Sequence, residues 1–526
     1  MQNVPLNKLD ASSMVGTVMV SLLKSCLPAA PFFQRQIGSR LFATVLVAWT
    51  TTSSGLEVRQ EKPVGDGVVG TASCKMVPQP LCISSSLFPL KSTLRTWLMM
   101  YLALSKLIFM RLEANTAAAT GALEMLETRL LPVVGEETIP LNECAGRILA
   151  KDIVAERDVP PHDNSAVDGY AVYFDDLSPE GETELPVIGR VAAGQPLEGT
   201  PQRGTALRIF TGAPIPDDAN GPDTIFMQED SVLRDETGQT IVVLPNGITR
   251  GANRRSRGED IQSGNVVLRK GDRLRPQDIG LAASLGIPKL EVFRRLTVGV
   301  MSTGDEVVDP GQTVPAGGIY DANRHALMAI LSDLGCDVRD FGIVADDAHR
   351  ISETLTAAAQ ACDAVISTAG MSVGEEDHLA ETIRGLGALH FWKVAIKPGR
   401  PIAFGQINGT PFIGLPGNPA AMMVTFLRMA RPALLKLAGA SDLRPRLYPI
   451  RAGFAHRKKR NRREYVRVHL EDGEDGFPVA RKHPRSGAGI LSSLVEADGL
   501  VELPEEMTQL EEGAMVSFLP FTEVAR

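Results

Sequence analysis

The residues best suited to chemistry follow an apolar run at residues 364–366, where the chain turns into a loop of small and hydroxyl side chains. The loop runs from Ser367 to Gly374 and leads to acids that open a helix near Glu376. A buried strand that feeds such a corner leaves backbone N–H groups unpaired, and these groups form a cradle for phosphate. This part of the sequence therefore predicts a phosphate site between a strand and a helix.

Cations and a second glycine corner lie close behind this loop. Lys393, Lys397 and Arg400 come first, and residues 414–419 read Gly-Leu-Pro-Gly-Asn-Pro before another expected helix. Acids, cations and open amide donors within one α/β unit suit a phosphorylated ligand that is held together with a divalent cation.

A parallel sheet would bring these groups together, because residues 295–440 alternate strand and helix patterns. The expected strands are 296–301, 338–344 and 364–367, and the expected helices are 323–334 and the segment after Asp347. Acids and hydroxyls follow the strands, at Asp305, Glu306, Asp346, Asp347, Thr368 and Ser372. A single acid at a strand end is more often a helix N-cap than a catalyst. Several strand ends that share one chemistry indicate a ligand site at that edge of the sheet.

Three further regions flank this unit, so the predicted fold class is a multidomain α/β protein with a Rossmann-like parallel α/β domain at 295–440. A β-rich inserted module is expected at 171–245, with strands at 185–191, 206–210, 224–228 and 240–244. An N-terminal mixed linking domain is expected from 110–170 and 246–294, with helices at 118–131, 142–150 and 274–285. Short alternating strands at 441–526 indicate a C-terminal β domain.

Polar motifs outside the α/β unit each allow both a structural and a functional interpretation. The turn-rich segment that contains Asp168 is an Asx turn on the simpler interpretation, or a carboxylate site for a cation. Thr211 lies in a tight corner, and the arginines near Asp260 are typical of a solvated ion-pair cluster. A basic run at 456–467, with Glu464 as its only acid, indicates contact with nucleic acid, or more often a solvated loop or support for an anionic small ligand.

Composition narrows the class of protein. A formal net charge of −8 over 526 residues argues against general nucleic-acid binding. The six cysteines are scattered without a C-x-x-C pair, which indicates reduced, mostly buried thiols in a cytosolic protein, and neither zinc nor disulfides. The length suggests three or four domains.

The first 109 residues differ from the remainder. They hold four of the 62 acids but ten of the 54 lysines and arginines. Their apolar runs at 41–49 and 97–110 are too short to span a bilayer comfortably. We expect residues 1–109 to be a leader outside the fold, with translation from Met110 as the simpler interpretation and an organelle transit peptide as the alternative.

Eight motifs follow one another along the rest of the chain. They are Asp-Asn-Ser-Ala-Val-Asp-Gly-Tyr at 163–170, Thr-Gly-Ala-Pro at 211–214, Arg-Gly-Glu-Asp at 257–260, Ser-Thr-Gly-Asp-Glu at 302–306, Tyr-Asp-Ala-Asn-Arg at 320–324, Ser-Val-Gly at 372–374, Lys-Pro-Gly at 397–399 and the corner at 414–419. As a set they resemble the molybdopterin molybdenumtransferase family, which is related to the plant molybdenum-insertase domain and the C-terminal domain of gephyrin. The resemblance covers the chain from about Thr116 onward, which favours Met110 as the start.

The resemblance implies an elongated four-domain subunit that forms a homodimer, with an active site between the α/β domain of one subunit and the β-rich module of its partner. It implies an enzyme that inserts molybdate into adenylylated molybdopterin and releases AMP in a Mg²⁺-dependent step. Molybdopterin adenylyltransferase would donate the substrate, and molybdoenzymes or their chaperones would accept the product. The protein would work in the cytoplasm, without nucleic acid or membrane.

Correspondence with the family's motifs assigns the site residues. Catalytic roles fall on Asp168, Asp260, Glu306, Asp377, Lys393 and Lys397. Substrate binding falls on Thr211, Ser302, Thr303, Gly304, Thr368, Gly370, Ser372, Gly374, Pro416, Gly417, Asn418, Arg400 and Arg467. The metal would be held by Glu306, Asp346 and Asp377. The sequence departs from the family at Ala369, Ala421 and Arg400, where glycine, serine and lysine are usual, and around residues 486–489.

Two other functions stay open. The loop at Ser372 also resembles the molybdopterin adenylyltransferase fold, but that enzyme is essentially the α/β domain alone, so the flanking modules argue against it. The other alternative is a scaffold without catalysis. The presence of Asp168, Glu306, Asp377 and Lys397 argues against a pure scaffold.

Overall fold

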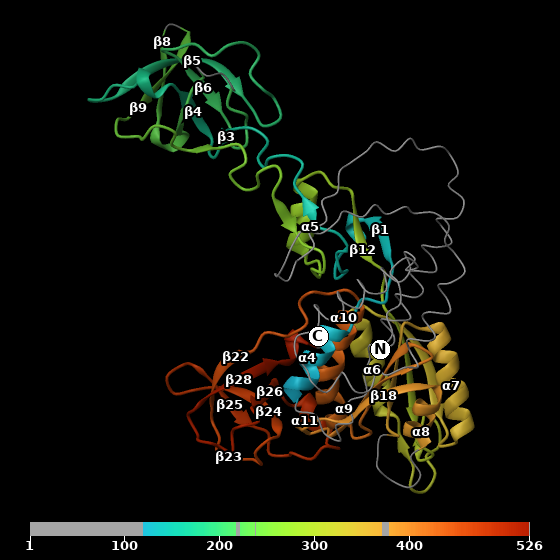
Figure 1. Ribbon diagram of the computed structural model, residues 1–526. Helices are drawn as coiled ribbons and strands as arrows, with labels where there is room; N and C mark the ends of the chain where they lie inside the picture. Colours follow the sequence, from blue (N-terminus) through green and yellow to red (C-terminus); the bar gives the residue numbers. More distant parts are fainter. Residues whose placement is uncertain (1–118, 217–220, 237, 371–377, 525–526) are drawn as a thin grey trace, which may run out of the picture. The chain divides into compact units, whose positions relative to one another are not determined.

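The computed structural model describes residues 119–216, 221–236, 238–370 and 378–524 (Figure 1). The chain divides into two compact units, Met1–Phe88 and Pro89–Arg526, and every described residue belongs to the second unit. The expected leader at 1–109 therefore lies outside the described residues. Within the described part of the chain, no helix is both long and apolar enough to cross a membrane.

The mixed linking domain is built from two segments of chain that meet in small sheets. Its elements are α4 (Ala119–Arg129), β1 (Glu136–Pro140), β2 (Ile153–Val154), β11 (Val266–Leu268), α5 (Pro276–Ser284) and β12 (Lys289–Phe293). β1 pairs with β12 and β2 pairs with β11, both antiparallel. Leu149, Leu274 and Leu290 form part of the core between them. A proline at the first turn and the Asp278 carboxylate, which accepts the Arg275 N–H at 2.8 Å, start α5.

The prediction of a helix at residues 142–150 is wrong. Only a short 3-10 turn forms there, at Leu141–Glu143, and Gly146 then takes a positive φ of 72°. Ile148 and Leu149 make isolated bridges to Arg273 and Val292 instead. Tertiary pairing of the backbone therefore outweighs the local helical pattern of this segment.

The β-rich module is a six-stranded sheet in the order β7-β4-β6-β5-β9-β8. Its strands are β4 (Gly169–Val172), β5 (Thr183–Val191), β6 (Ala206–Ile209), β7 (Thr224–Met227), β8 (Val232–Glu236) and β9 (Gln239–Leu244). The expected strands are confirmed, but β8 was not predicted. All five residues of β8 are exposed. A strand with no buried face does not require alternating apolar and polar residues, so its sequence carries no strand signal.

The α/β domain has a mixed six-stranded sheet in the order β16-β13-β17-β21-β20-β18. Its strands are β13 (Thr297–Thr303), β16 (Asp337–Val344), β17 (Ala364–Thr368), β18 (Gly387–Lys393), β20 (Pro401–Ile407) and β21 (Thr410–Leu415). The first four strands in the sheet order are parallel, as expected. β20 runs antiparallel to both β21 and β18, so the expectation of an entirely parallel sheet is wrong at this edge.

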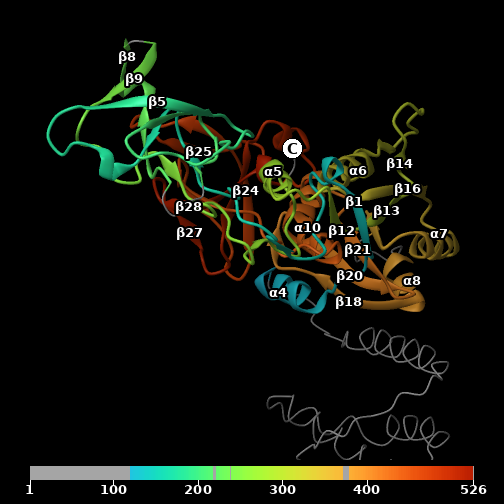
Figure 2. The same cartoon turned by 90° about the horizontal axis from the view of Figure 1, so that it is seen from above.

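Helices cover both faces of this sheet and bury separate cores. They are α6 (Ala322–Leu334), α7 (Ala348–Ala361), α8 (His378–Leu386), α9 (Pro419–Thr425), a π-helical segment η5 (Phe426–Ala430) and α10 (Arg431–Leu437). Leu327 of α6 belongs to one core, and Ile351 of α7 and Ile383 of α8 belong to the other. α7 and α8 lie side by side in both views (Figures 1 and 2). Asp321 and Asp347 are the N-caps of α6 and α7.

The C-terminal domain is a small closed β-structure. Its main strands are β22 (Tyr448–Ala452), β24 (Arg463–Asp472), β25 (Pro478–Lys482), β26 (Gly499–Leu503) and β28 (Met515–Pro520). β24 pairs with both β25 and β26, which closes the sheet into a barrel. β19 (Ile396–Lys397), which precedes β20 in the chain, pairs with β24 and ties the α/β domain to the barrel.

The cysteines confirm the sequence analysis only in part. Cys144, Cys336 and Cys362 are the three in the described residues, and all are free thiols. Cys144 is buried, but Cys336 and Cys362 are partly exposed. The expectation of mostly buried thiols is therefore wrong for these two.

Candidate functional site

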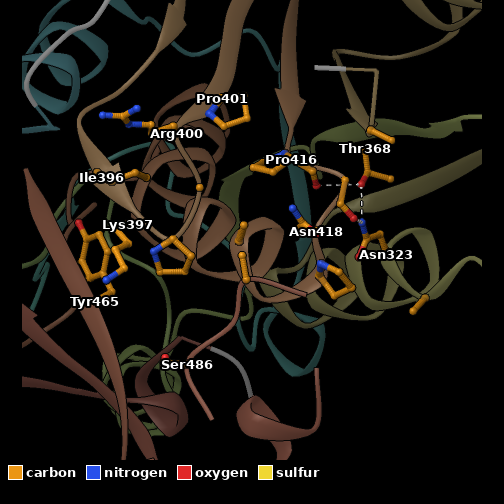
Figure 3. Close-up of a pocket in the computed structure, with 18 of the residues that line it drawn as sticks. Asn323, Thr368, Ile396, Lys397, Arg400, Pro401, Pro416, Asn418, Tyr465 and Ser486 are labelled. Atoms are coloured by element: carbon orange, nitrogen blue, oxygen red, sulfur yellow. Dashed lines mark hydrogen bonds between the residues drawn. The ribbon is translucent and has the colours of Figure 1, made fainter. Parts of the chain in front are cut away.

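A cavity of about 860 Å³ lies where the α/β domain meets the barrel. Its walls come from the ends of β13 and β17, the start of α6, the loop before α9, β19, and the barrel strands β24 and β25. Lys397 and Tyr465 lie on one side of the cavity, and Asn323 and Thr368 lie on the other (Figure 3). The ligand site predicted at the carboxyl ends of the strands thus coincides with a real cavity.

Neutral polar groups dominate the side formed by the strand ends. The Asn323 amide donates to Thr368 Oγ1 at 2.9 Å and to the Gly417 carbonyl at 2.7 Å, which joins the start of α6 to the end of β17 and to the loop before α9 (Figure 3). Ser302 Oγ, Thr303 Oγ1 and Asn323 Oδ1 are buried, and they have no hydrogen-bond partner within the described residues. Buried polar atoms are nearly always paired, so three such atoms beside one cavity indicate a polar ligand.

Tight backbone corners complete this side. Ala369 and Gly370 both adopt positive φ, at 71° and 64°. A Cβ at Gly370 would lie 2.5 Å from Thr303 Oγ1, so only glycine fits there. Ala369 occupies the left-handed region at a cost of about 1–2 kcal/mol. Alanine at position 369 is therefore a source of strain at the cavity.

Cations dominate the barrel side of the cavity. The basic residues that line it are Lys397, Arg400, His456, Arg462, Arg467, Lys482, His483 and Arg485. Arg467 is buried, and its guanidinium donates to the Gly487 carbonyl at 3.0 Å and to Ser493 Oγ at 2.7 Å. Burial lowers the pKa of Arg467. Arg462 Nε is buried and, among the described residues, lacks a hydrogen-bond partner.

Acids gather at the open edge of the sheet beyond the cavity. Glu306 lines the cavity, and the Asp346 N–H donates to Asp305 Oδ1 at 3.1 Å. Loss of solvation and the nearby charges of Asp305 and Glu306 raise the pKa of Asp346. A divalent cation near these acids would relieve this repulsion. Across the described residues, however, no three histidine, cysteine or acidic side chains stand in metal-binding geometry.

Some predicted site residues lie elsewhere in the fold. Lys393 is in β18, where it pairs with Pro401, and is not among the cavity's lining residues. Asp168 and Thr211 form a local pair in the β-rich module: the Thr211 N–H and Oγ1 donate to Asp168 Oδ1 at 2.7 and 2.8 Å. These hydrogen bonds lower the pKa of Asp168. Asp260 is exposed, and its N–H donates to the Val159 carbonyl.

The remaining predicted residues divide into two groups. The cavity lining includes Ser302, Thr303, Glu306, Thr368, Gly370, Lys397, Arg400, Pro416, Gly417, Asn418 and Arg467. Gly304 lies beside it, with φ 133°, and a Cβ there would come within 2.6 Å of Glu306 Oε2. Ser372, Gly374 and Asp377 lie outside the described residues.

Sequence reasoning missed the centre of the cationic wall. Glu464 is buried and accepts hydrogen bonds from Lys397, His456 and Arg462, all of which line the cavity. Its only signal in the sequence was a single acid within a run of cations. Asn323 was also missed as a cavity residue, because its amide gives no charge signal.

Three family models match successive parts of the chain. They are the MoeA N-terminal region (domain I and II) at residues 118–286, the probable molybdopterin binding domain at 299–436 and the MoeA C-terminal region (domain IV) at 449–521. Their boundaries leave residues 1–117 without a match to these models.

Whole proteins and solved structures resemble the chain over the same span. A molybdopterin molybdenumtransferase of Haemophilus influenzae is 36% identical over 402 residues, which cover 76% of this chain and 97% of that protein. One of Nostoc is 34% identical, over 73% of this chain and 88% of that protein. A crystal structure of the molybdopterin biosynthesis MoeA protein from Pyrococcus horikoshii is 31% identical, with a TM-score of 0.65, and covers 77% of this chain and 99% of that chain. The three family models, matched in order along the chain, and the sequence identity to these relatives show that this protein belongs to the molybdopterin molybdenumtransferase (MoeA) family.

Proposed function

We propose that this protein inserts molybdate into adenylylated molybdopterin and releases AMP. The supporting observation is the two-sided character of the cavity. One side offers unpaired hydroxyl and amide groups at the strand ends, and the other side carries the cations of the barrel and β19. The hydroxyl and amide groups suit a phosphorylated pterin, and the cations suit a tetrahedral oxyanion. Both sets of groups line the same cavity of about 860 Å³.

The strand-end side is assigned to the phosphate and pterin portion of the substrate. Ser302 Oγ and Thr303 Oγ1 supply hydroxyl groups that can donate hydrogen bonds without adding charge. Asn323 keeps this side in place, because it bonds to Thr368 at the end of β17 and to Gly417 in the loop before α9. Fixed donors of this kind orient a phosphate without reorganisation when the reaction proceeds.

The cationic side is assigned to molybdate. Lys397 brings a compact positive charge from β19, and Arg462 brings a buried N–H that has no partner within the described residues. Both can attract a doubly charged oxyanion. Arg467 supports this wall by holding Gly487 and Ser493.

The acids at the sheet edge are assigned to Mg²⁺. Glu306 and Asp346 would hold it, together with Asp377 from outside the described residues. The raised pKa of Asp346 supports this assignment, because like charges gathered without a cation repel each other. When bound, Mg²⁺ would neutralise charge on the adenylyl phosphate.

The proposed active form is a homodimer in which the partner's β-rich module completes the site. Asp168 and Thr211 already form an ordered carboxylate–hydroxyl pair, although they are absent from the cavity lining of the same chain. The proposed substrate donor is molybdopterin adenylyltransferase, and the proposed acceptors are molybdoenzymes or their chaperones.

The test is direct. Purified full-length protein is mixed with adenylylated molybdopterin, molybdate and Mg²⁺, and both AMP and the molybdenum-bearing pterin are measured. We expect both products to appear in equal amounts, and omission of molybdate should abolish the second. Formation of adenylylated molybdopterin from ATP would instead support the adenylyltransferase alternative, and the absence of all turnover would support a scaffold.

A further inference from the structure

The cationic wall of the cavity is organised around one buried carboxylate. Glu464 lies on β24 with only 2% of its surface exposed. Its Oε2 accepts from Lys397 Nζ at 3.1 Å and faces His456 Nε2 at 3.1 Å, while its Oε1 accepts from Arg462 Nη2. The three partners come from β19, β23 (His456–Arg457) and the turn before β24. One acid therefore fixes the relative positions of side chains from three separate segments.

The contacts continue beyond Glu464. Lys482 Nζ lies 3.3 Å from His456 Nδ1. A protonated lysine can only donate, so Nδ1 of His456 accepts and its Nε2 carries the hydrogen that points to Glu464. The result is a hydrogen-bonded chain from Lys482 through His456 and Glu464 to Lys397, and all four residues line the cavity.

Charge counting shows what the carboxylate does to this wall. Lys397, Arg462 and Lys482 carry three positive charges, His456 is neutral in the tautomer above, and Glu464 removes one charge. Burial alone would raise the pKa of Glu464, but hydrogen bonds from His456, Arg462 and Lys397 outweigh burial and lower it. Glu464 is thus a permanent counter-ion beneath an anion site.

We propose that Glu464 is a positioning residue that orients Lys397 and Arg462 and weakens the binding of molybdate to the level that turnover requires. This inference rests on the proposed function, because it concerns the same cavity. Without the carboxylate, the wall would hold a doubly charged oxyanion more tightly but in a less defined orientation. Affinity and turnover should therefore change in opposite directions, which general damage to the fold would not produce.

The barrel supplies a matched control. Glu502 on β26 is also buried, and it pairs with Arg428 at 2.8 Å and with Arg463 at 3.4 Å. Neither Glu502 nor these two arginines is among the cavity's lining residues. Glu502→Gln removes a buried carboxylate from the same domain while leaving the cationic wall as it is.

The experiment uses the full-length protein and two readouts. Binding of sodium molybdate is measured by calorimetry, and product formation is followed while molybdate is varied. For Glu464→Gln we expect the molybdate Kd to fall by about tenfold and turnover to fall by about tenfold, the scale of one hydrogen bond to a charged group. Glu502→Gln should keep the parent's Kd. An unchanged or weaker affinity in Glu464→Gln would overturn the proposal.

Glu464→Asp provides a second arm should Glu464→Gln not fold. It keeps the charge but is one methylene shorter, so the molybdate Kd should stay within about twofold of the parent while turnover drops several-fold. Parent-like turnover in Glu464→Asp would reject the positioning role. A parent protein that neither binds molybdate nor forms product would contradict the proposed function itself, whereas an active parent with a parent-like Glu464→Gln contradicts only this inference.

Discussion

At the scale of single residues, the cavity depends on side chains held by specific partners. Asn323 joins α6 to the end of β17 and to the loop before α9 through two hydrogen bonds, and Glu464 joins three basic side chains through one carboxylate. Ser302 and Thr303 keep buried hydroxyls that, within the described residues, have no partner. The contacts of Glu464 gather basic side chains on one wall of the cavity, although the whole protein has a net charge of −8.

Ala369 gives a prediction at this scale. Its φ of 71° is unfavourable for an L residue, and glycine removes that strain at a smaller entropic cost in the unfolded chain. Ala369→Gly should raise the free energy of unfolding by about 0.5–1 kcal/mol, as measured by urea denaturation. Glycine to alanine at Gly370 is the opposing control and should be destabilising, because its Cβ would meet Thr303 Oγ1. Destabilisation by Ala369→Gly would show that the positive φ is not strained.

At the scale of elements, the link between β19 and β24 joins the α/β domain to the barrel. β19 pairs with β24 through Ile396 and Lys397, opposite Arg463 and Glu464. The same register places Lys397 against Glu464, so the strand pairing and the ion pair depend on each other.

The stability of this link should depend on pH. The ordinary pKa of a glutamate is 4.5, and that of folded Glu464 is lower, so its contribution is complete above about pH 4.5 and is lost as pH falls through the folded value. Glu464→Gln should lower the free energy of unfolding by about 1–3 kcal/mol at pH 7. Chemical denaturation from pH 7 to pH 3.5 should show this difference shrinking below about pH 4.5. A difference that grows in acid would mean that the carboxylate is protonated in the folded protein.

Sequence patterns predicted some elements of this fold but not others. Periodicity located β13, β17, α6 and α7, because each has a clear apolar face or a continuous apolar run. It failed at residues 142–150, where long-range bridges to Arg273 and Val292 decide the backbone. It could not place Glu464 beside Lys397, because that contact depends on a two-residue strand crossing into another domain. The acids and tight backbone corners of the site could be predicted from sequence motifs. The hydrogen-bond partners of these side chains could not, because tertiary pairing of the strands determines them.

At the scale of the whole molecule, the site residues assigned by resemblance occupy two places. Glu306 and Lys397 line the cavity of the α/β domain and barrel, whereas Asp168 and Thr211 lie in the β-rich module. The proposed homodimer with composite sites would account for this separation, since each β-rich module would complete the site of the partner subunit.

Mixed dimers test this arrangement. Asp168→Asn and Lys397→Ala should each be nearly inactive as homodimers. Composite sites predict that heterodimers of the two variants recover up to about half of the parent activity per dimer, because one of their two sites contains neither substitution. Heterodimers isolated with two different affinity tags provide the measurement, and Asp168→Asn mixed with itself under both tags is the control. No recovery in verified heterodimers would place all the residues in one subunit's site.

In the proposed function, the cations bind molybdate and the acids bind the adenylyl phosphate through Mg²⁺. Titration of molybdate against Lys397→Ala and Glu306→Gln, with AMP and finished cofactor both followed, separates these two roles. Lys397→Ala should raise the molybdate requirement roughly tenfold to hundredfold, the effect of losing about 1.5–3 kcal/mol at a charged contact, while adenylylated molybdopterin still binds. Glu306→Gln should slow AMP release, and added Mg²⁺ should restore it only in part. An unchanged molybdate requirement in Lys397→Ala, or AMP release at the parent rate in Glu306→Gln, would contradict this division of roles.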